Sequence, residues 1–267
     1  MKASETTGPR GAGPVRLFCF HHAGGGATAF AGWRSALGRD VEVVPVVLPD
    51  RGPGRRPAGP GELTTLVDEL AERLAPQLAG PHVFYGHSMG ALVAYLLARA
   101  RHALGQPPPR RLIVAAFAAP HLATAPRADG TPASTGQAAG AAGAPGSAPL
   151  GHVWQRGDRD LLAWLSSLSG VPPELLDGRE HRSRLLGRLR EHLRLCASYQ
   201  QPAPVALPCP IDVFAGLADP LVPLEHAAAW RDYSTAGCTV HEMRGGHFFP
   251  RESKRIFFPE LRRALAA

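Results

Sequence analysis

The sequence predicts an α/β protein with a mostly parallel central sheet that is covered by helices on both faces. Short apolar segments alternate along the chain with segments whose apolar residues recur at helical spacing. A chain of 267 residues with 45% hydrophobic content can bury a large core as a single domain. Within this alternation, one apolar segment runs through a Gly-x-Ser-x-Gly turn directly into a helical pattern.

The chain opens with residues 1–14, a polar segment rich in Gly and Pro that has no apolar signal-peptide core. We expect it to be a disordered lead-in. Residues 16–20 form a buried strand, which ends at residues 21–26 with the sequence HHAGGG. Glycine lets the backbone of such a loop approach a ligand closely, although a simple flexible turn is the alternative interpretation.

A second apolar strand covers residues 41–48 and ends in a loop of Pro, Gly and charged residues at 49–54. Leucines and a valine at helical spacing then predict a helix over residues 63–74, which stops near Pro76.

Residues 83–95 carry the most informative motif, Gly86-x-Ser88-x-Gly90, between an apolar strand and an apolar helix. A turn this tight brings backbone against backbone, so a Cβ at either glycine would collide with a neighbour. We expect Ser88 at the apex, with the positive end of the helix beside its hydroxyl. The alternative is a chance match in a glycine-rich chain, which the flanking strand and helix argue against.

Residues 111–117 form another buried strand, after which the composition changes. Between 122 and 151 the chain consists largely of small residues that pack poorly, so we expect a mobile insert. Leucines then predict two amphipathic helices, at 161–168 and 185–193, with a short helical turn at 172–176 between them. These helices interrupt the alternation, so we expect a lid over the sheet, with ordinary covering helices as the alternative. The predicted division is a core of residues 15–121 and 206–267, with an insert and lid at 122–205.

The sheet resumes at residues 211–215, and the loop that follows carries Asp219. A helix at 224–233 and a last strand at 238–243 come next, before a C-terminal helix that reaches Leu265.

Ser88, Asp219 and His247 have the residue types and the chain order of the catalytic triad in the α/β-hydrolase fold. Serine is a weak nucleophile and needs a base within hydrogen-bond reach, which a carboxylate in turn orients. Each of the three follows a predicted strand, so all should lie at one edge of a parallel sheet. Taken singly, Asp219 could be a turn residue and His247 a loop histidine. We predict the backbone N–H groups of Ala23 and Met89 as the two oxyanion donors.

Other histidines fit the site less well. His87 adjoins the serine, but we expect it to point to the other side of the turn and to serve in packing. His241 lies within a strand and His226 on a helix, where no base is needed. His21 and His22 are adjacent and lack the spacing of a helical metal pair, so we expect neither a metal nor a cofactor.

The composition argues against several other classes of protein. A net charge of +7 suits nucleic acid or an acidic protein, yet the arginines are scattered and no nucleic-acid motif is present. No apolar run is long enough to span a membrane. The four cysteines match neither a zinc site nor a disulfide framework, which is typical of free thiols in a cytoplasmic protein.

Four motifs together resemble type II thioesterases of polyketide and nonribosomal peptide assembly lines. They are residues 22–25 (HAGG), 86–91 (GHSMGA), 209–211 (CPI) and 246–249 (GHFF). The resemblance covers the chain from Val15 onward. It implies hydrolysis of acyl groups from the phosphopantetheine arm of an acyl carrier protein or peptidyl carrier protein, by a monomeric enzyme. In that family Ser88 would accept the acyl group, His247 would activate water, and residues 159–199 would form a lid that shapes the acyl chamber.

The sequence departs from the family in two motifs, and its Gly/Ala insert before the lid is longer than the family leads us to expect. Residues 48–52 read LPDRG where LPGRE is usual, and Glu191-His192 stand where the family has Ala-Asp in the last lid helix. Substrate range and lid behaviour therefore stay open, as does transfer to an acceptor other than water. A carboxylesterase with the same triad is one alternative function, and a non-catalytic carrier-protein binder is another.

The second lid helix also carries several arginines, for which we expect faces other than its leucine stripe. Exposed arginines near the pocket mouth would attract an acidic carrier protein, and salt would weaken that attraction. The residues concerned are Arg182, Arg184, Arg188, Arg190 and Arg194.

Overall fold

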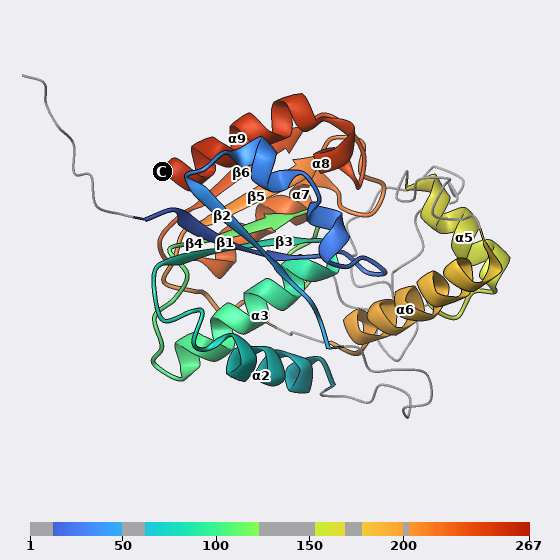
Figure 1. The fold of residues 1–267 in the computed structure, drawn as a ribbon, viewed down its shortest axis with the longest axis horizontal. Helices are drawn as coiled ribbons and strands as arrows, with labels where there is room; N and C mark the ends of the chain where they lie inside the picture. The colour runs from blue at the N-terminus through green and yellow to red at the C-terminus, as the bar shows by residue number, and fades with distance from the viewer. Residues whose placement is uncertain (1–12, 50–61, 123–152, 169–177, 200–202) are drawn as a thin grey trace, which may run out of the picture.

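The computed structural model describes residues 13–49, 62–122, 153–168, 178–199 and 203–267 (Figure 1). Several predicted segments lie wholly or almost wholly outside these ranges. They are the lead-in at 1–14, the insert at 122–151, the helical turn at 172–176 and the loop at 49–54.

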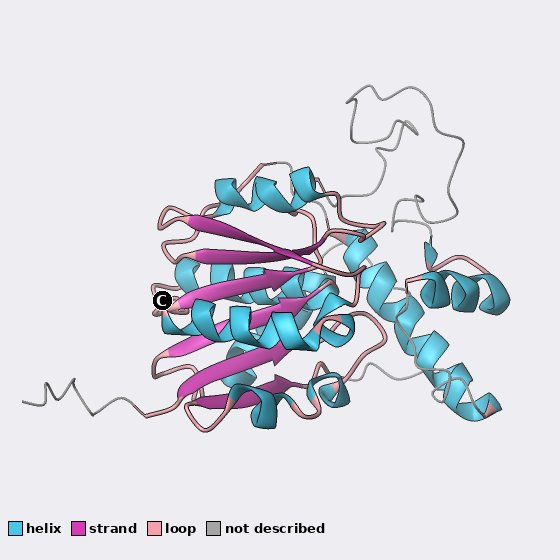
Figure 2. Cartoon of the chain, turned by 90° about the horizontal axis from the view of Figure 1, so that it is seen from above, coloured by secondary structure: helices cyan, strands magenta, loops and turns pink. Residues whose placement is uncertain are grey.

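A parallel sheet forms the centre of the molecule, which confirms the predicted fold class. Its strands are β1 Val15–Phe20, β2 Val41–Val46, β3 His82–His87, β4 Arg111–Ala115, β5 Ile211–Gly216 and β6 Cys238–Met243. The strand order is β2-β1-β3-β4-β5-β6, and every neighbouring pair is parallel. Figure 2 shows the arrowheads pointing to one edge, so the loops that follow β3, β5 and β6 share that edge.

Helices cover both faces of the sheet (Figure 1). They are α1 Trp33–Leu37, α2 Glu62–Leu74, α3 Met89–Ala103, α7 Leu224–Ala228, α8 Phe249–Glu252 and α9 Lys254–Ala266. The helices α2 and α3 lie on one face, and α1 and α9 lie on the other.

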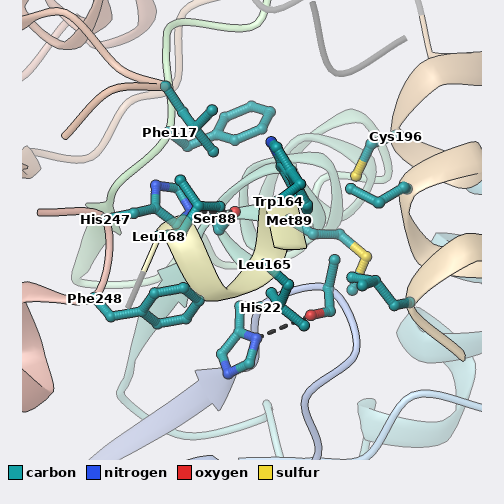
Figure 3. Close-up of a pocket in the computed structure, with 14 residues that line it drawn as sticks. His22, Ser88, Met89, Phe117, Trp164, Leu165, Leu168, Cys196, His247 and Phe248 are labelled. Carbon is teal, nitrogen blue, oxygen red and sulfur yellow. Dashed lines mark hydrogen bonds between the residues drawn. The ribbon is translucent and has the colours of Figure 1, made fainter. Parts of the chain in front are cut away.

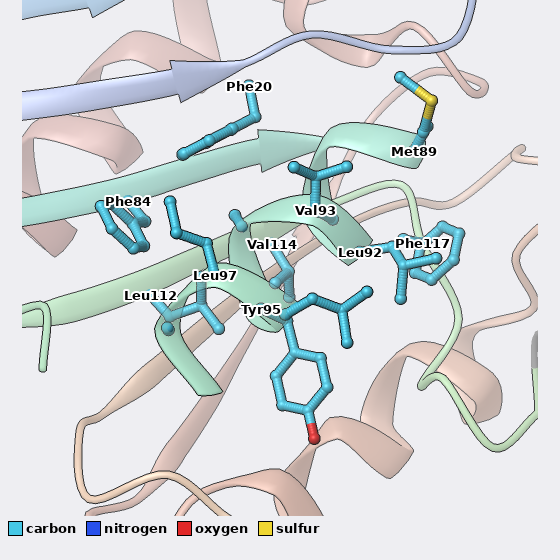
Figure 4. Close-up of a cluster of buried hydrophobic side chains, with 14 of the residues drawn as sticks. Phe20, Phe84, Met89, Leu92, Val93, Tyr95, Leu97, Leu112, Val114 and Phe117 are labelled. Carbon is cyan, nitrogen blue, oxygen red and sulfur yellow. The ribbon is translucent and has the colours of Figure 1, made fainter. Parts of the chain in front are cut away.

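The first strand shows how this layering follows from the sequence. Side chains alternate across a strand, so Phe18 and Phe20 face α3 while Leu17 and Cys19 face α1 and α9. All four are completely buried, because both faces of the sheet are covered. This explains why the strand reads as a continuous apolar run rather than as an alternation. Figure 4 shows the larger of the two cores, between the sheet and α3.

Both predicted lid helices are present, as α5 Asp158–Ser167 and α6 Arg179–Ser198. Their apolar faces pack on each other through Trp164, Leu186 and Leu193, and this small core also includes Phe248 from the loop after β6. Figure 2 shows both helices beyond the carboxyl edge of the sheet. The boundaries predicted for the insert and lid remain a prediction.

Some predicted elements were wrong in detail. The strand predicted to reach Leu48 ends at Val46, and the next residue is 57% exposed. The helix predicted at 224–233 changes after Ala228 to a 3-10 turn, Ala229–Tyr233. A 3-10 turn aligns side chains three residues apart, which lets Trp230 and Tyr233 both reach the core.

At the C-terminus, two helices replace the single one predicted. They are α8 and α9, and Ser253, whose backbone is not helical (φ −120°, ψ 38°), separates them. Between β1 and β2 the prediction missed α1 and the 3-10 turn Ala27–Phe30. These elements are too short to show a helical period in the sequence.

Candidate active site

Ser88 occupies the turn between β3 and α3 in a strained conformation, with φ 54° and ψ −123°. Its backbone N–H donates to the carbonyl of Ala115 at 2.8 Å, which ties the turn to β4. A Cβ on Gly86 would lie 2.2 Å from the carbonyl oxygen of Gly90, and one on Gly90 would lie 2.1 Å from that of Phe20. Only glycine fits at either position, as the sequence argument required.

The structure brings Ser88, His247 and Asp219 together in one hydrogen-bonded chain, although they come from three separate loops. His247 Nε2 lies 3.0 Å from Ser88 Oγ, and His247 Nδ1 lies 2.8 Å from Asp219 Oδ2. The imidazole can therefore accept the serine proton at Nε2 while the carboxylate accepts its Nδ1–H. The His247 and Asp219 side chains are almost fully buried, 5% and 0% exposed.

Close backbone packing holds the aspartate and histidine loops against each other. A Cβ on Gly216, at the end of β5, would lie 2.4 Å from the carbonyl oxygen of Gly246. The N–H of Gly246 donates to the Glu252 carboxylate at 2.8 Å. The other oxygen of Asp219 accepts the N–H of Leu221 at 2.9 Å, so both of its oxygens are fixed. The acid is thus pre-oriented toward His247.

The two proposed oxyanion donors lie beside the serine. Ala23 and Met89 line the same pocket as Ser88 and His247. In the part of the chain that the structure describes, no acceptor is recorded for the N–H of Ala23 or that of Met89. Met89 is the first residue of α3, so its N–H has no acceptor within the helix and lies at the positive end of the dipole.

An apolar pocket extends from these groups toward α5 and α6 (Figure 3). It holds about 420 Å³ of empty space when its open mouth is included. Apart from the catalytic candidates, its wall is largely made of Met89, Phe117, Trp164, Leu165, Leu168, Leu189, Leu193, Cys196, Leu221 and Phe248. Such a wall suits an apolar chain bound close to the serine.

The structure corrects the prediction for His87. Its ring packs, as expected, but it lies against the site rather than away from it. It stacks on Phe248 with ring centroids 5.5 Å apart, and it contacts the ring of His247 at the same separation. Burial, and next the charge of a protonated His247, hold the pKa of His87 well below its ordinary value. A neutral His87 therefore forms one wall behind the imidazole of His247.

Asp212, an acid on β5 seven residues before Asp219, belongs to a separate network. It forms ion pairs with Arg111 and with His241 Nε2, the latter at 2.6 Å. Burial raises its pKa, but the hydrogen bonds from His241 and Arg111 outweigh burial and leave the pKa lowered. This network occupies both carboxylate oxygens, which leaves Asp219 as the acid bonded to His247.

Sequence reasoning missed the contact between the glycine loop and α6. The N–H of Gly24 donates to His192 Nδ1 at 3.0 Å, and Arg188 Nε donates to the carbonyl of Gly24 at 3.0 Å. The one signal in the sequence was the departure at His192, where the resemblance implies an aspartate.

The described residues offer neither a metal site nor a membrane-spanning helix. In these segments, no group of three or more His, Cys, Asp and Glu side chains is placed to hold a metal ion. No helix in the described ranges is both long enough and apolar enough to cross a membrane.

A parallel sheet with a serine at a strand-to-helix turn, and with a histidine and an aspartate after later strands, defines the α/β-hydrolase class. Comparison with known proteins narrows this class to one family. The family model described as a thioesterase domain matches residues 15–265. Linear gramicidin dehydrogenase LgrE of Brevibacillus parabrevis is 33% identical over 88% of this chain and 81% of its own length.

Solved structures agree with the family match. RedJ, a thioesterase from the prodiginine biosynthetic pathway in Streptomyces coelicolor, has a TM-score of 0.75 and 30% identity over 97% of this chain and 96% of its own. BorB, a type II thioesterase from the borrelidin biosynthetic cluster, has a TM-score of 0.70 and 27% identity, with coverage of 93% and 91%. The chain belongs to the thioesterase family, and the resemblance to type II thioesterases is confirmed.

Proposed function

We propose that the protein hydrolyses acyl thioesters on the phosphopantetheine arm of an acyl or peptidyl carrier protein, in polyketide or nonribosomal peptide biosynthesis. The observation that carries the proposal is the hydrogen-bonded chain Ser88–His247–Asp219, of which Ser88 and His247 line an apolar pocket. The names of the solved relatives support the setting, since RedJ is a thioesterase of the prodiginine biosynthetic pathway and BorB a type II thioesterase of the borrelidin biosynthetic cluster. No cofactor takes part in the proposed reaction.

In the first half of the reaction, Ser88 Oγ attacks the thioester carbonyl while His247 Nε2 accepts the hydroxyl proton. Asp219 holds the Nδ1–H of the imidazole and stabilises its positive charge. The negative charge on the carbonyl oxygen is stabilised by the N–H groups of Ala23 and Met89. When the C–S bond breaks, His247 returns the proton to the leaving thiolate, which leaves an acyl-Ser88 ester and a free pantetheine thiol.

In the second half, water takes the place of the thiol. His247 Nε2 accepts a proton from water as the oxygen attacks the acyl-serine carbonyl, and the same two N–H groups stabilise the second oxyanion. Breakage of the C–O bond then returns the proton to Ser88 Oγ and releases the carboxylic acid. The apolar pocket would hold the acyl chain through both halves.

The name of LgrE refers to a dehydrogenase, but the site of this chain favours acyl transfer. A serine hydroxyl 3.0 Å from an imidazole nitrogen, with a buried carboxylate on the other nitrogen, activates an oxygen nucleophile. We further propose a monomer that works in the cytoplasm, a setting that the four unpaired cysteines support.

The test compares an acyl carrier protein, the matching acyl-pantetheine and a matched oxygen ester as substrates for wild type and Ser88→Ala. We expect the carrier thioester to react fastest with wild type, and an acyl adduct on Ser88 to appear by intact mass. Ser88→Ala should lose the adduct and several orders of magnitude in rate. Faster turnover of the oxygen ester would instead indicate a carboxylesterase, and a variant that kept more than about a tenth of the rate would exclude Ser88 as nucleophile.

A further inference from the structure

Helix α6 binds the glycine loop through both backbone polar groups of one residue, Gly24. The N–H of Gly24 donates to His192 Nδ1 and its carbonyl accepts from Arg188 Nε, each at 3.0 Å. Residues 188 and 192 are four apart, so both side chains leave the same face of the helix. Leu189 lies between them, and a Cβ on Gly24 would be 3.3 Å from its side chain. The loop backbone is therefore in direct contact with the helix.

The residue before Gly24 is Ala23, whose N–H is a proposed oxyanion donor. The loop is compact, because Gly25 N–H donates to the carbonyl of His22 at 3.0 Å and the His22 ring bonds the carbonyl of Ala23 at 2.9 Å. Gly24 itself has φ 76°, which sets the direction of the chain at that point. A shift of Gly24 would therefore move the peptide group of Ala23 with it. Oxyanion donors act only when they lie about 2.7–3.1 Å from the developing charge, so such a shift would weaken transition-state binding.

The contact needs a particular protonation state of His192. Nδ1 can accept the Gly24 N–H only if it carries no proton, which puts the ring proton on Nε2. The groups that face this ring are His21, which stacks on it at 5.7 Å, His22 and Arg188. Burial first, and then the positive charges of these neighbours, lower the pKa of His192 to about 3. The ring therefore stays neutral and accepting at ordinary pH.

We propose that His192 and Arg188 are positioning residues through which the lid helix α6 sets the place of the oxyanion donor Ala23. The inference rests on the proposed function, since it assigns a task to residues that do not touch the reacting atoms. The proposed contact couples the lid to the active site, because the glycine loop keeps its productive geometry only while α6 packs against it. A lid helix that moved away would remove both contacts to Gly24 at once.

The test uses two variants of His192 that differ in one respect. His192→Asn keeps an acceptor oxygen near the place of Nδ1, whereas His192→Leu fills the space without an acceptor. His181→Leu, on the exposed start of α6, is the matched control. Each is assayed with acyl-pantetheine for kcat, KM and the single-turnover acylation rate, and for affinity toward a trifluoromethyl ketone that forms a tetrahedral adduct on Ser88.

We expect His192→Leu to lower the acylation rate by about 10- to 100-fold, somewhat less than removal of a donor itself, with KM changed by less than about threefold. The affinity for the tetrahedral adduct should fall by a similar factor. His192→Asn should recover most of both losses, and His181→Leu should resemble wild type. A second variant, Arg188→Met, should give a smaller loss of the same kind, and it serves if His192→Leu does not fold.

Acylation by a folded His192→Leu or Arg188→Met within about twofold of wild type would overturn the inference. A rise in KM without a loss of adduct affinity would overturn it too, because a merely structural or binding role would produce that pattern. Ser88→Ala in the same assays tests the proposed function separately from the positioning role of His192 and Arg188. If it abolishes acylation, the proposed function stands whatever the His192 variants do.

Discussion

Acidification should destabilise the protein through the buried imidazole of His192. The unfolded chain takes up a proton on this residue near pH 6.5, whereas in the folded protein the pKa is lowered to about 3. Below pH 6.5 the unfolded state therefore binds more protons than the folded state. The stabilisation is fully present above pH 6.5 and is lost progressively as the pH falls toward the folded pKa. At about 1.4 kcal/mol per pH unit, a change from pH 7 to pH 5 removes roughly 2 kcal/mol through this residue alone.

The measurement is urea unfolding at pH 7 and at pH 5, followed by tryptophan fluorescence, for wild type and His192→Asn. The asparagine cannot titrate, so the free energy of unfolding of the variant should fall by about 2 kcal/mol less than that of wild type over the same pH change. Other buried histidines titrate in both proteins and cancel in the difference. The exposed His181→Asn should behave like wild type. An equal fall in wild type and His192→Asn, within about 0.5 kcal/mol, would refute the reasoning.

Three further outcomes are expected. Asp219→Asn should lower turnover by about a thousandfold or more with little change in thermal stability, whereas Asp212→Asn should leave the chemical step unchanged. A lower kcat in Asp212→Asn than in Asp219→Asn would contradict the assignment of Asp219 as the acid of the triad. Gly86→Ala should lower the free energy of unfolding by several kcal/mol, because the added Cβ would lie 2.2 Å from the carbonyl oxygen of Gly90. If the variant unfolds at the same urea concentration as wild type, the turn can widen to accept the Cβ. Turnover of a carrier-bound thioester should fall as salt rises from roughly 0.05 to 0.5 M, while turnover of acyl-pantetheine should change little. Arg182→Glu should lower turnover of the carrier-bound substrate in the same way. Equal salt dependence for both substrates would contradict electrostatic attraction of the carrier protein.

Most of the sheet could be predicted from the sequence because β1, β3, β4 and β5 are short, largely apolar runs. The edge strand β6, with sequence CTVHEM, is half polar and gives a weaker signal. The same kind of reasoning failed where a local conformation depends on a distant contact. The change from α7 to a 3-10 turn places Trp230 and Tyr233 against Tyr95, from another part of the chain. The pattern of residues 224–233 alone is equally compatible with one helix, so only the packed core distinguishes the two.

In the candidate site, the residue types and their chain order indicated Ser88, Asp219 and His247, because each follows a strand of a parallel sheet. The support around them could not be predicted in this way. Gly24 and His192 are separated by 168 positions in the sequence, and no local pattern relates a glycine loop to a lid histidine. The packing of His87 on Phe248 likewise depends on how the loop after β6 folds back over the elbow.

The arginines of α6 show how the structure changes the interpretation of a charged helix. Arg188 binds the carbonyl of Gly24, Arg190 pairs with Asp158, and Arg184 pairs with Glu180 on the same helix. The charges of Arg184 and Arg190 are therefore partly neutralised by nearby carboxylates, and Arg188 holds the glycine loop. A loss of activity in Arg188→Ala would no longer indicate a docking surface, because the same side chain supports the proposed oxyanion loop. Carrier attraction is tested more cleanly at the exposed Arg182, and any carrier protein that docks on α6 would act on a helix that is bonded to the catalytic loop.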